Sequence, residues 1–388
     1  MLTFIQFCSI ITLNKFAEES GAMELKKYPC TEISEIRVQG RISTRKTDGI
    51  PLFWTGSAIE FNVTGSEARL EYECEYHDGE SYIRIEIDGT EMYRFMLEEG
   101  IHTVNVFRGF SADAVKNVRI FRETQASHTI VKMKAIYTNG EFRPVPKRMK
   151  IELLGDSVTS GEGLAGAKCH NFWIPAVFSS RGEYGIVTAN ALDADWSIVA
   201  MSGFGFYCDW QNNIHNAIPA SYEYVCGTVK SDELEALGAL DIYDFENCGA
   251  DITVVNLGSN DGSALGGKEY VDKDGTIYKI HAGEDGKPIP EDAEKLSKAV
   301  YETLSKIRKY NPKTKIVWCY NMLNDKLNDV IVSEAENYKK MTGDENVFTL
   351  ELPRSPAELV GARSHPGIGA HKLFADALTK KIEEILKR

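Results

Sequence analysis

The sequence predicts an α/β protein in two parts: a C-terminal flavodoxin-like domain with a parallel sheet, preceded by an N-terminal β-sandwich of jelly-roll type. Three observations predict this fold. Apolar and polar residues alternate from about Cys30 to Val145, and near-continuous apolar runs separated by helical stretches follow from Met149 onward. A short segment rich in proline and charge separates the two patterns.

The alternation is clearest at residues 82–89, where Ile83, Ile85 and Ile87 are separated by charged residues and Asp88-Gly89 supplies a hairpin turn. Many short strands without a convincing helix are typical of a sandwich. The other strands expected in this half are Ala58 to Val63, Ala68 to Tyr76, Met92 to Met96, Thr103 to Phe107, Asn117 to Phe121 and Ile130 to Tyr137.

The segment Phe142 to Arg148 contains two prolines and clustered charge, so we expect a linker between a sandwich at 30–145 and a second domain at 149–388. Residues 1–29 are expected to form an N-terminal extension outside the fold. The apolar run from Leu2 to Leu13 has no preceding Lys or Arg, and Met23 could serve as a start. A cytoplasmic protein is therefore predicted, with secretion as the alternative if residues 1–22 act as a signal peptide.

The apolar runs of the second domain predict strands buried on both faces of a parallel sheet. They lie at Met149 to Leu154, Trp196 to Met201, Ile252 to Leu257, Lys315 to Tyr320 and Val347 to Leu352. Helices are expected at Glu291 to Tyr310, Ser333 to Met341 and Ala370 to Lys387. Such folds place their sites beyond the carboxyl ends of the strands.

Composition argues against several classes of partner. The formal net charge is -13, and no basic run interleaved with aromatics occurs, so nucleic acid is a poor partner. No stretch reaches the roughly 20 apolar residues of a membrane span. The eight cysteines have no metal-binding spacing and are interpreted as reduced, mostly buried thiols. We expect no metal and no organic cofactor.

Four strand or helix ends carry residues suited to acyl transfer. They supply Ser157 in Gly-Asp-Ser, Gly203 in Ser-Gly-Phe-Gly, Asn260 in Gly-Ser-Asn-Asp, and His365 in Ser-His-Pro-Gly. A serine hydroxyl needs a base to take its proton, and histidine suits this. The backbone N–H groups of Ser157 and Gly203 and the amide of Asn260 would form an oxyanion hole.

Each part also has an ordinary structural explanation. A Gly-Asp-Ser turn can cap a helix, Asn260-Asp261 can be an Asx turn, and His365 before Pro366 can simply begin a helix. It is the combination, each part at a strand or helix end, that favours a site.

At these residues the chain resembles the SGNH (GDSL) hydrolases. A longer resemblance, over about residues 30 to 388, is to carbohydrate esterase family 2, whose members carry a jelly-roll domain before the hydrolase and deacetylate xylan and glucomannan-type sugars. It is carried by Gly40-Arg41, 54–61, Arg122-Glu-Thr124, 150–157, 202–207 and 255–261.

SGNH enzymes usually place an Asp three residues before the histidine, where this chain has Ala362. Family 2 members are known for a Ser-His dyad, so the resemblance implies that a main-chain oxygen near Ala362 to Ser364 orients His365. Glu358 is the alternative orienting group. Asp156 and Asp261 are expected to organise loops.

Two further features have open interpretations. The insertion Gly262 to Asp292 either overhangs the cleft or is a solvated loop. Phe204, Tyr207 and Trp210 follow Gly203, and one or two of them could stack on a sugar, although such aromatics are more often core.

The resemblance implies a serine esterase acting on acetylated oligosaccharides or polysaccharides. The alternatives are an SGNH esterase or lipase for another acyl ester, and a carbohydrate-binding protein without catalysis. The sandwich is expected to be structural and to flank the cleft, and a homodimer is conceivable.

Overall fold

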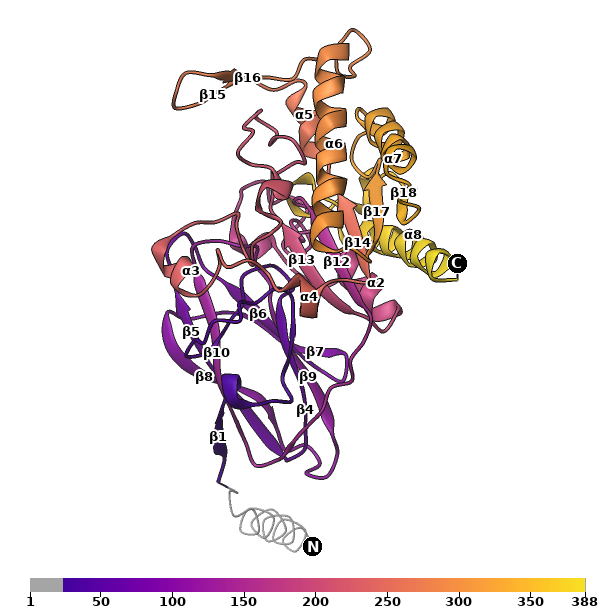
Figure 1. Ribbon diagram of the computed structural model, residues 1–388. Helices are drawn as coiled ribbons and strands as arrows, with labels where there is room; N and C mark the ends of the chain where they lie inside the picture. The colour runs from indigo at the N-terminus through magenta and orange to yellow at the C-terminus, as the bar shows by residue number, and fades with distance from the viewer. Residues whose placement is uncertain (1–23, 388) are drawn as a thin grey trace, which may run out of the picture.

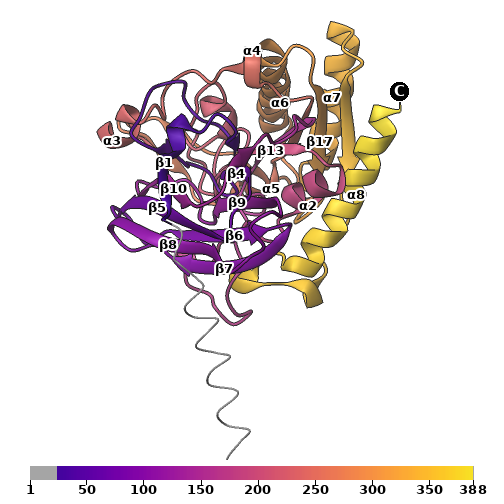
Figure 2. The same ribbon diagram turned by 90° about the horizontal axis from the view of Figure 1, so that it is seen from below.

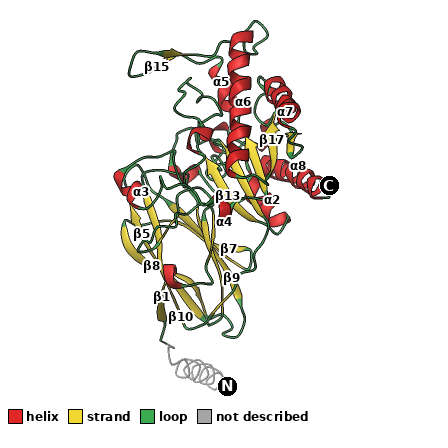
Figure 3. Cartoon of the chain, viewed as in Figure 1, coloured by secondary structure: helices red, strands yellow, loops and turns green. Residues whose placement is uncertain are grey.

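The computed structural model describes residues 24–387, in which a lower half of strands joins an upper half of helices around a sheet (Figures 1 and 3). Residues 1–23 of the extension predicted at 1–29, with the start-site and signal-peptide alternatives, lie outside the described residues, whereas residues 26–29 form a strand of the fold.

Two antiparallel sheets make up the N-terminal half, and their order is β1-β10-β5-β8 with β3 on β10, and β11-β4-β9-β6-β7 with β2 on β4. The first contains β1 (Lys26–Pro29), β3 (Ile50–Pro51), β5 (Glu67–Glu75), β8 (Gly100–Arg108) and β10 (Ile130–Thr138). The second contains β2 (Arg37–Gln39), β4 (Ala58–Val63), β6 (Tyr82–Ile87), β7 (Thr90–Met96), β9 (Lys116–Arg122) and β11 (Phe142–Arg143). This confirms a β-rich N-terminal domain, whereas the jelly-roll type stays a prediction.

In the strand with the period-two pattern, the face opposite the isoleucines is not simply exposed to solvent. Ile83, Ile85 and Ile87 face the sandwich core, but Arg84 between them is only 1% exposed because it faces the second domain. Both β1 and β11 were missed: β1 pairs with β10, so the sheet begins before Cys30, and β11 makes part of the expected linker a strand.

The second half holds a parallel sheet in the order β13-β12-β14-β17-β18, the 2-1-3-4-5 order of flavodoxin-like folds. Its strands are β12 (Lys150–Gly155), β13 (Asp195–Ala200), β14 (Ile252–Asn256), β17 (Lys315–Tyr320) and β18 (Val347–Glu351). Leu153 belongs to the apolar cluster on one face and Leu154 to the cluster on the other, which explains the continuous apolar runs.

Helices cover both faces of this sheet. The helices α6 (Pro290–Tyr310) and α7 (Asn328–Thr342) pack on one face, and α2 (Tyr184–Ala191) and α8 (Ile368–Leu386) on the other (Figure 2). Shorter elements follow the loops: α3 (Asp232–Ala236), α4 (Phe245–Cys248), α5 (Ser259–Ala264) and the hairpin β15 (Tyr270–Val271) and β16 (Ile277–Tyr278). No helix within residues 24–387 is long and apolar enough to cross a bilayer.

The two halves share a buried interface. Phe121 of β9 stacks on Trp196 of β13 with ring centroids 5.7 Å apart, and both belong to one apolar cluster. The fully buried Arg41 donates to Glu152 of β12, at 3.0 Å from Nε to Oε1. Arg148, in the predicted linker, pairs with Glu60 of the sandwich and with Asp195 of β13. Arg148 therefore joins the end of the segment to both halves.

The seven cysteines within the described residues are all free thiols, and five of them are buried, as expected. Across residues 24–387 no group of three or more His, Cys, Asp or Glu side chains is placed to hold a metal ion.

Candidate active site

Ser157 lies in a tight turn directly after β12. The side chain of Asp156 accepts a hydrogen bond of 3.0 Å from the backbone N–H of Val158, and the carbonyl of Ser157 accepts one of 3.0 Å from the N–H of Glu162. A Cβ on Gly155 would lie 2.0 Å from Thr159 Oγ1, so only glycine permits this turn. The turn holds Ser157 at 5% exposure at the carboxyl end of the strand.

His365 is the partner of Ser157. Its Nε2 lies 2.9 Å from Ser157 Oγ, and its Nδ1 lies 2.9 Å from the carbonyl oxygen of Arg363. A carbonyl can only accept a hydrogen bond, so Nδ1 carries the proton in the neutral ring and Nε2 is left to accept from the serine hydroxyl. This is the tautomer that a general base for serine requires.

The main-chain oxygen expected between Ala362 and Ser364 is thus that of Arg363. Ala362, which stands where an Asp was expected, is fully buried, and its carbonyl accepts from His365 N–H at 3.1 Å. Glu358 is exposed, and within the described residues no hydrogen bond joins it to His365. The geometry therefore favours the carbonyl over the carboxylate.

The three expected oxyanion donors lie at the ends of β12, β13 and β14. The backbone N–H groups of Ser157 and Gly203 donate to no other group within residues 24–387. Asn260 Nδ2 donates to the carbonyl of Phe204 at 2.9 Å and lies 3.4 Å from an oxygen of Asp156. The first contact fixes the amide, and the second, longer contact to Asp156 is the one that an oxyanion would replace.

Asp156 and Asp261 organise loops, as the sequence predicted. Asp261 accepts hydrogen bonds of 3.1, 2.8 and 3.0 Å from the backbone N–H groups of residues 206–208, which ties the loop after Gly203 to the end of β14. Burial raises the pKa of Asp156 to about 7, and the charges of Asp261 and Glu162 add to the effect. Burial also raises the pKa of Asp261 to about 6, against the effect of its backbone hydrogen bonds.

Of the three aromatic candidates, only Trp210 is well exposed, at 52%. A Cβ on Gly203 would lie 3.2 Å from its Cδ1 atom, so the indole sits directly against the oxyanion glycine. Phe204 and Tyr207 are half-buried and pack against the core.

The insertion after α5 is anchored beside the same loop. Asn212 Nδ2 donates to the carbonyls of Ala264 and Lys268 at 3.0 and 2.8 Å, and its Oδ1 accepts from Ile280 N–H at 2.9 Å. The hairpin β15–β16 projects away from the sheet beyond this anchor (Figure 1). Its base therefore lies close to Trp210, while its tip extends outward.

Two residues at the site were not found from the sequence. Gln125 of the sandwich accepts a hydrogen bond of 3.0 Å from the N–H of Ser202, next to Gly203. Glu162 is 2% exposed, pairs with Arg363, and has Oε2 3.7 Å from His365 Nε2. The only available signal for Glu162 was a carboxylate five residues after the serine.

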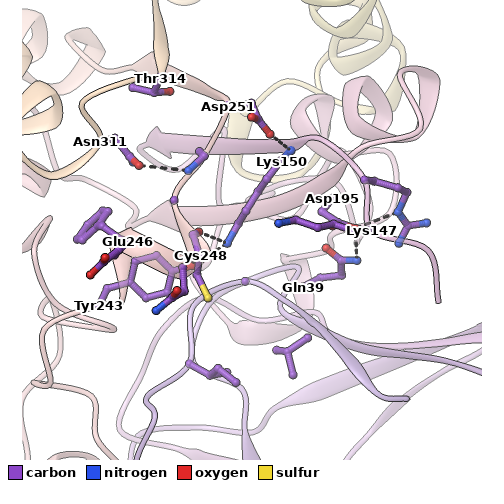
Figure 4. Close-up of a pocket in the computed structure, with 18 of the residues that line it drawn as sticks. Gln39, Lys147, Lys150, Asp195, Tyr243, Glu246, Cys248, Asp251, Asn311 and Thr314 are labelled. Carbon is purple, nitrogen blue, oxygen red and sulfur yellow. Dashed lines mark hydrogen bonds and ion pairs between the residues drawn. The ribbon is translucent and has the colours of Figure 1, made fainter. Parts of the chain in front are cut away.

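A cavity of 1030 Å³ lies at the opposite end of the sheet (Figure 4). It is lined by residues at the starts of strands, such as Lys150, whose Nζ donates to Tyr243 Oη at 2.6 Å and to the Cys248 carbonyl at 3.1 Å. Ser157 and His365 do not line it.

Comparisons with known proteins match the chain to carbohydrate esterases. The family model described as carbohydrate esterase 2 N-terminal matches residues 38–146. Cellulase/esterase CelE of Acetivibrio thermocellus is 26% identical over 359 residues, which are 90% of this chain and 39% of that protein. An acetylxylan esterase / glucomannan deacetylase of Cellvibrio japonicus is 28% identical over 233 residues, 58% of this chain and 61% of that protein. The chain thus spans less than two thirds of these relatives.

A solved structure gives a fuller match. The acetyl xylan esterase of the rumen bacterium Butyrivibrio proteoclasticus is 36% identical, with a TM-score of 0.91, over 94% of this chain and 100% of that chain. The likeness extends over both halves of the fold and the region of Ser157 and His365, and on this evidence the chain belongs to carbohydrate esterase family 2.

Proposed function

We propose that this protein is a serine esterase that removes O-acetyl groups from acetylated hemicellulose-type saccharides of the xylan or glucomannan kind. Ser157 is the nucleophile and His365 the general base. The observation that carries the proposal is the continuous hydrogen-bonded series from Ser157 Oγ through the imidazole to the Arg363 carbonyl, both contacts being 2.9 Å. The names of the family 2 relatives support the substrate class.

In the first half of the reaction, Ser157 Oγ attacks the acetyl carbonyl carbon as its proton passes to His365 Nε2. The oxyanion receives hydrogen bonds from the N–H groups of Ser157 and Gly203 and from Asn260 Nδ2. The carbon–oxygen bond to the sugar then breaks, and the sugar oxygen takes the proton from Nε2. This leaves an acetylated Ser157 and a free sugar hydroxyl.

In the second half, water attacks the acetyl-serine carbonyl while His365 Nε2 takes a proton from the water. The same donors hold the second oxyanion. Collapse releases acetate, and the proton on Nε2 returns to Ser157 Oγ. The imidazole is neutral at the start and at the end, so the Arg363 carbonyl only has to hold its orientation.

The test is acetate release from acetylated glucomannan, acetylated xylan and acetylated monosaccharides by the wild type and by Ser157→Ala. We expect the substitution to abolish release while thermal unfolding stays unchanged. Undiminished release by the variant would contradict the proposal. A parallel series of acetyl and longer acyl esters separates acetyl specificity from a general esterase or lipase, and binding of acetylated sugar without turnover by the wild type would indicate a non-catalytic protein.

The sandwich has a structural role at the cleft in this proposal, and its connectivity is of the jelly-roll type. Supporting the role, Arg94 of β7 donates to the carbonyls of Ala176 and Phe178 at 3.2 and 2.9 Å, and Gln125 accepts from Ser202 N–H. These contacts brace segments next to Ser157 and Gly203. The cytoplasmic location and the homodimer stay predictions, which fractionation and light scattering test.

A further inference from the structure

The carbonyl that orients His365 belongs to a backbone turn in an uncommon conformation. Arg363 and Ser364, neither of them glycine, have φ values of 54° and 58°. Each such residue is in a strained backbone conformation, which persists only where surrounding contacts hold it. The orientation of the imidazole therefore depends on whatever holds residues 363 and 364.

Backbone hydrogen bonds of Gly361, Ala362 and His365 contribute to holding this turn, and further contacts come from Arg363. Its backbone N–H donates to the carbonyl of His170 at 2.7 Å, and its Nη1 donates to the carbonyl of Asn171 at 3.2 Å. Its Nε donates to a carboxylate oxygen of Glu162. Glu162 provides the only charged partner of this guanidinium within the described residues.

Glu162 is itself fixed by the nucleophile turn. Its backbone N–H donates to the carbonyl of Ser157 at 3.0 Å, and its backbone pairs with Phe178. Its side chain is 2% exposed, so one buried carboxylate touches the turn that orients the base and lies five residues from the nucleophile. The second oxygen of this carboxylate is 3.7 Å from His365 Nε2, the atom that takes the serine proton.

We propose that Glu162 is the positioning residue for His365, acting through Arg363: their ion pair holds the left-handed turn whose carbonyl fixes the imidazole. The carboxylate thus orients His365 indirectly, through Arg363, whereas an Asp at the position of Ala362 would contact the histidine directly. It also provides negative charge near the imidazolium that forms when Ser157 attacks. This inference rests on the proposed function only in taking Ser157 and His365 as the reacting pair.

The first test is kinetic. Glu162→Gln keeps an oxygen for Arg363 but removes the charge, and Arg363→Lys keeps the charge but removes the planar fork. We expect each to lower kcat roughly 10- to 100-fold for an acetyl ester, the usual effect of losing a partner that orients a histidine, with KM nearly unchanged. Because both residues share one contact, the double variant should be slowed by much less than the product of the two single effects.

The second test does not depend on the substrate. A fluorophosphonate probe labels an activated serine. In this reaction Ser157 Oγ forms a bond to phosphorus, fluoride leaves, and the serine proton passes to His365. We expect intact-mass labelling of Glu162→Gln and Arg363→Lys to be slowed in proportion to kcat. The downfield proton resonance of the His365 Nδ1–H group should weaken or disappear in both variants.

Asp344→Asn is the control, because Asp344 forms an ion pair with Arg308 at 2.7 Å and lies away from the site; its side chain is 14% exposed, against 2% for Glu162. We expect some loss of stability with unchanged labelling. If the probe labels the wild type but the wild type releases no acetate from acetylated saccharides, the proposed substrate is wrong and the positioning role still holds. Labelling of folded Glu162→Gln and Arg363→Lys at the wild-type rate would overturn the positioning role, whatever the substrate.

Discussion

Glu123 of the sandwich accepts a hydrogen bond from the hydroxyl of Ser179 in the hydrolase half, with 2.5 Å between the two oxygens. Ser179 in turn donates its backbone N–H to the carbonyl of Gly161 at 3.1 Å, four residues after Ser157. Glu123 is completely buried and also pairs with Arg84, at 3.0 Å from Nε to Oε1. The sandwich thus contacts the nucleophile loop through a charged and fully enclosed group.

Replacing Glu123 by Gln should therefore affect both stability and activity. The substitution removes one of the two carboxylates that pair with buried Arg84, because Glu86 also pairs with it. Breaking a buried pair so that one charge is left unpaired costs about 3 to 5 kcal/mol, and the remaining Glu86 makes this the upper limit of the loss. We expect a loss within this limit in urea unfolding, and a reduced kcat because the Ser179 contact weakens. Glu141→Gln, which breaks an exposed pair with Arg143, should change stability by less than about 0.5 kcal/mol. Equal effects of the two substitutions would contradict this assignment.

Gly163 offers a test of the spacing between the nucleophile and base loops. Its φ is 86°, and a Cβ there would lie 2.5 Å from the carbonyl oxygen of Ala362 and 2.7 Å from His365 Cβ. Gly163→Ala should displace the imidazole, and a misplacement near 1 Å can cost about 100-fold in rate. Gly286→Ala is the control, because its φ is similar at 76° and nothing lies within 4 Å. If both variants keep wild-type kcat, the close approach does not matter for catalysis.

His371 should make the protein less stable in acid. Burial, followed by the nearby charge of His365, lowers the pKa of His371 to about 3, and its Nδ1 accepts from Tyr184 N–H at 3.1 Å. Between about pH 6.5 and pH 3 the unfolded chain binds a proton at this residue and the folded chain does not. Folding stability must then fall as pH falls, by up to about 1.4 kcal/mol per pH unit.

His371→Gln removes the ionisable group and can still accept from Tyr184. We expect a shallower decline of unfolding free energy between pH 6.5 and pH 4 than in the wild type, measured by urea titration at each pH. His77→Gln, at an exposed histidine, serves as the comparison. Identical slopes for wild type and His371→Gln would refute the assignment.

The fold could be predicted where periodicity was strong. Ile83, Ile85 and Ile87 alternate with charged residues, and β12 places apolar side chains on both faces of its sheet, so both strands were found nearly to the residue. Short elements such as β1 were missed because a four-residue strand has too little pattern of its own and is defined by its pairing with β10. The burial of Arg84 was not predictable because it depends on how the two halves pack together.

The site was predictable where its residues lie in local sequence motifs, and not where they depend on contacts between distant segments. Ser157 and His365 each lie in a recognisable local motif, and the resemblance to family 2, together with the absence of Asp at position 362, implied a main-chain acceptor. The role of Arg363 as that acceptor depends on a backbone with positive φ, which no residue type signalled. Gln125 and Glu162 act through contacts between distant segments, and these arise only after folding.

Asn260 should matter for the rate and little for binding. Its amide is held by the Phe204 carbonyl at 2.9 Å, and its longer contact to Asp156, at 3.4 Å, is the one that the oxyanion would replace. Removing one oxyanion donor typically costs about 100- to 1000-fold in kcat. We expect Asn260→Ala to show this loss with an almost unchanged KM in acetate-release assays. A raised KM with normal kcat would instead assign the amide to ground-state binding.

Trp210 should matter for binding of the sugar and little for the chemistry. Its indole is 52% exposed and lies against Gly203, so a saccharide whose acetyl group reaches the oxyanion hole would lie beside it. We expect Trp210→Ala to raise KM several-fold for acetylated oligosaccharides, because the aromatic contact with the sugar ring is lost. An acetyl ester without a sugar, such as 4-nitrophenyl acetate, should show almost no change. Trp173→Ala removes another exposed indole and serves as the control; equal KM effects from both would assign the loss to general surface hydrophobicity rather than to a contact beside the reacting serine.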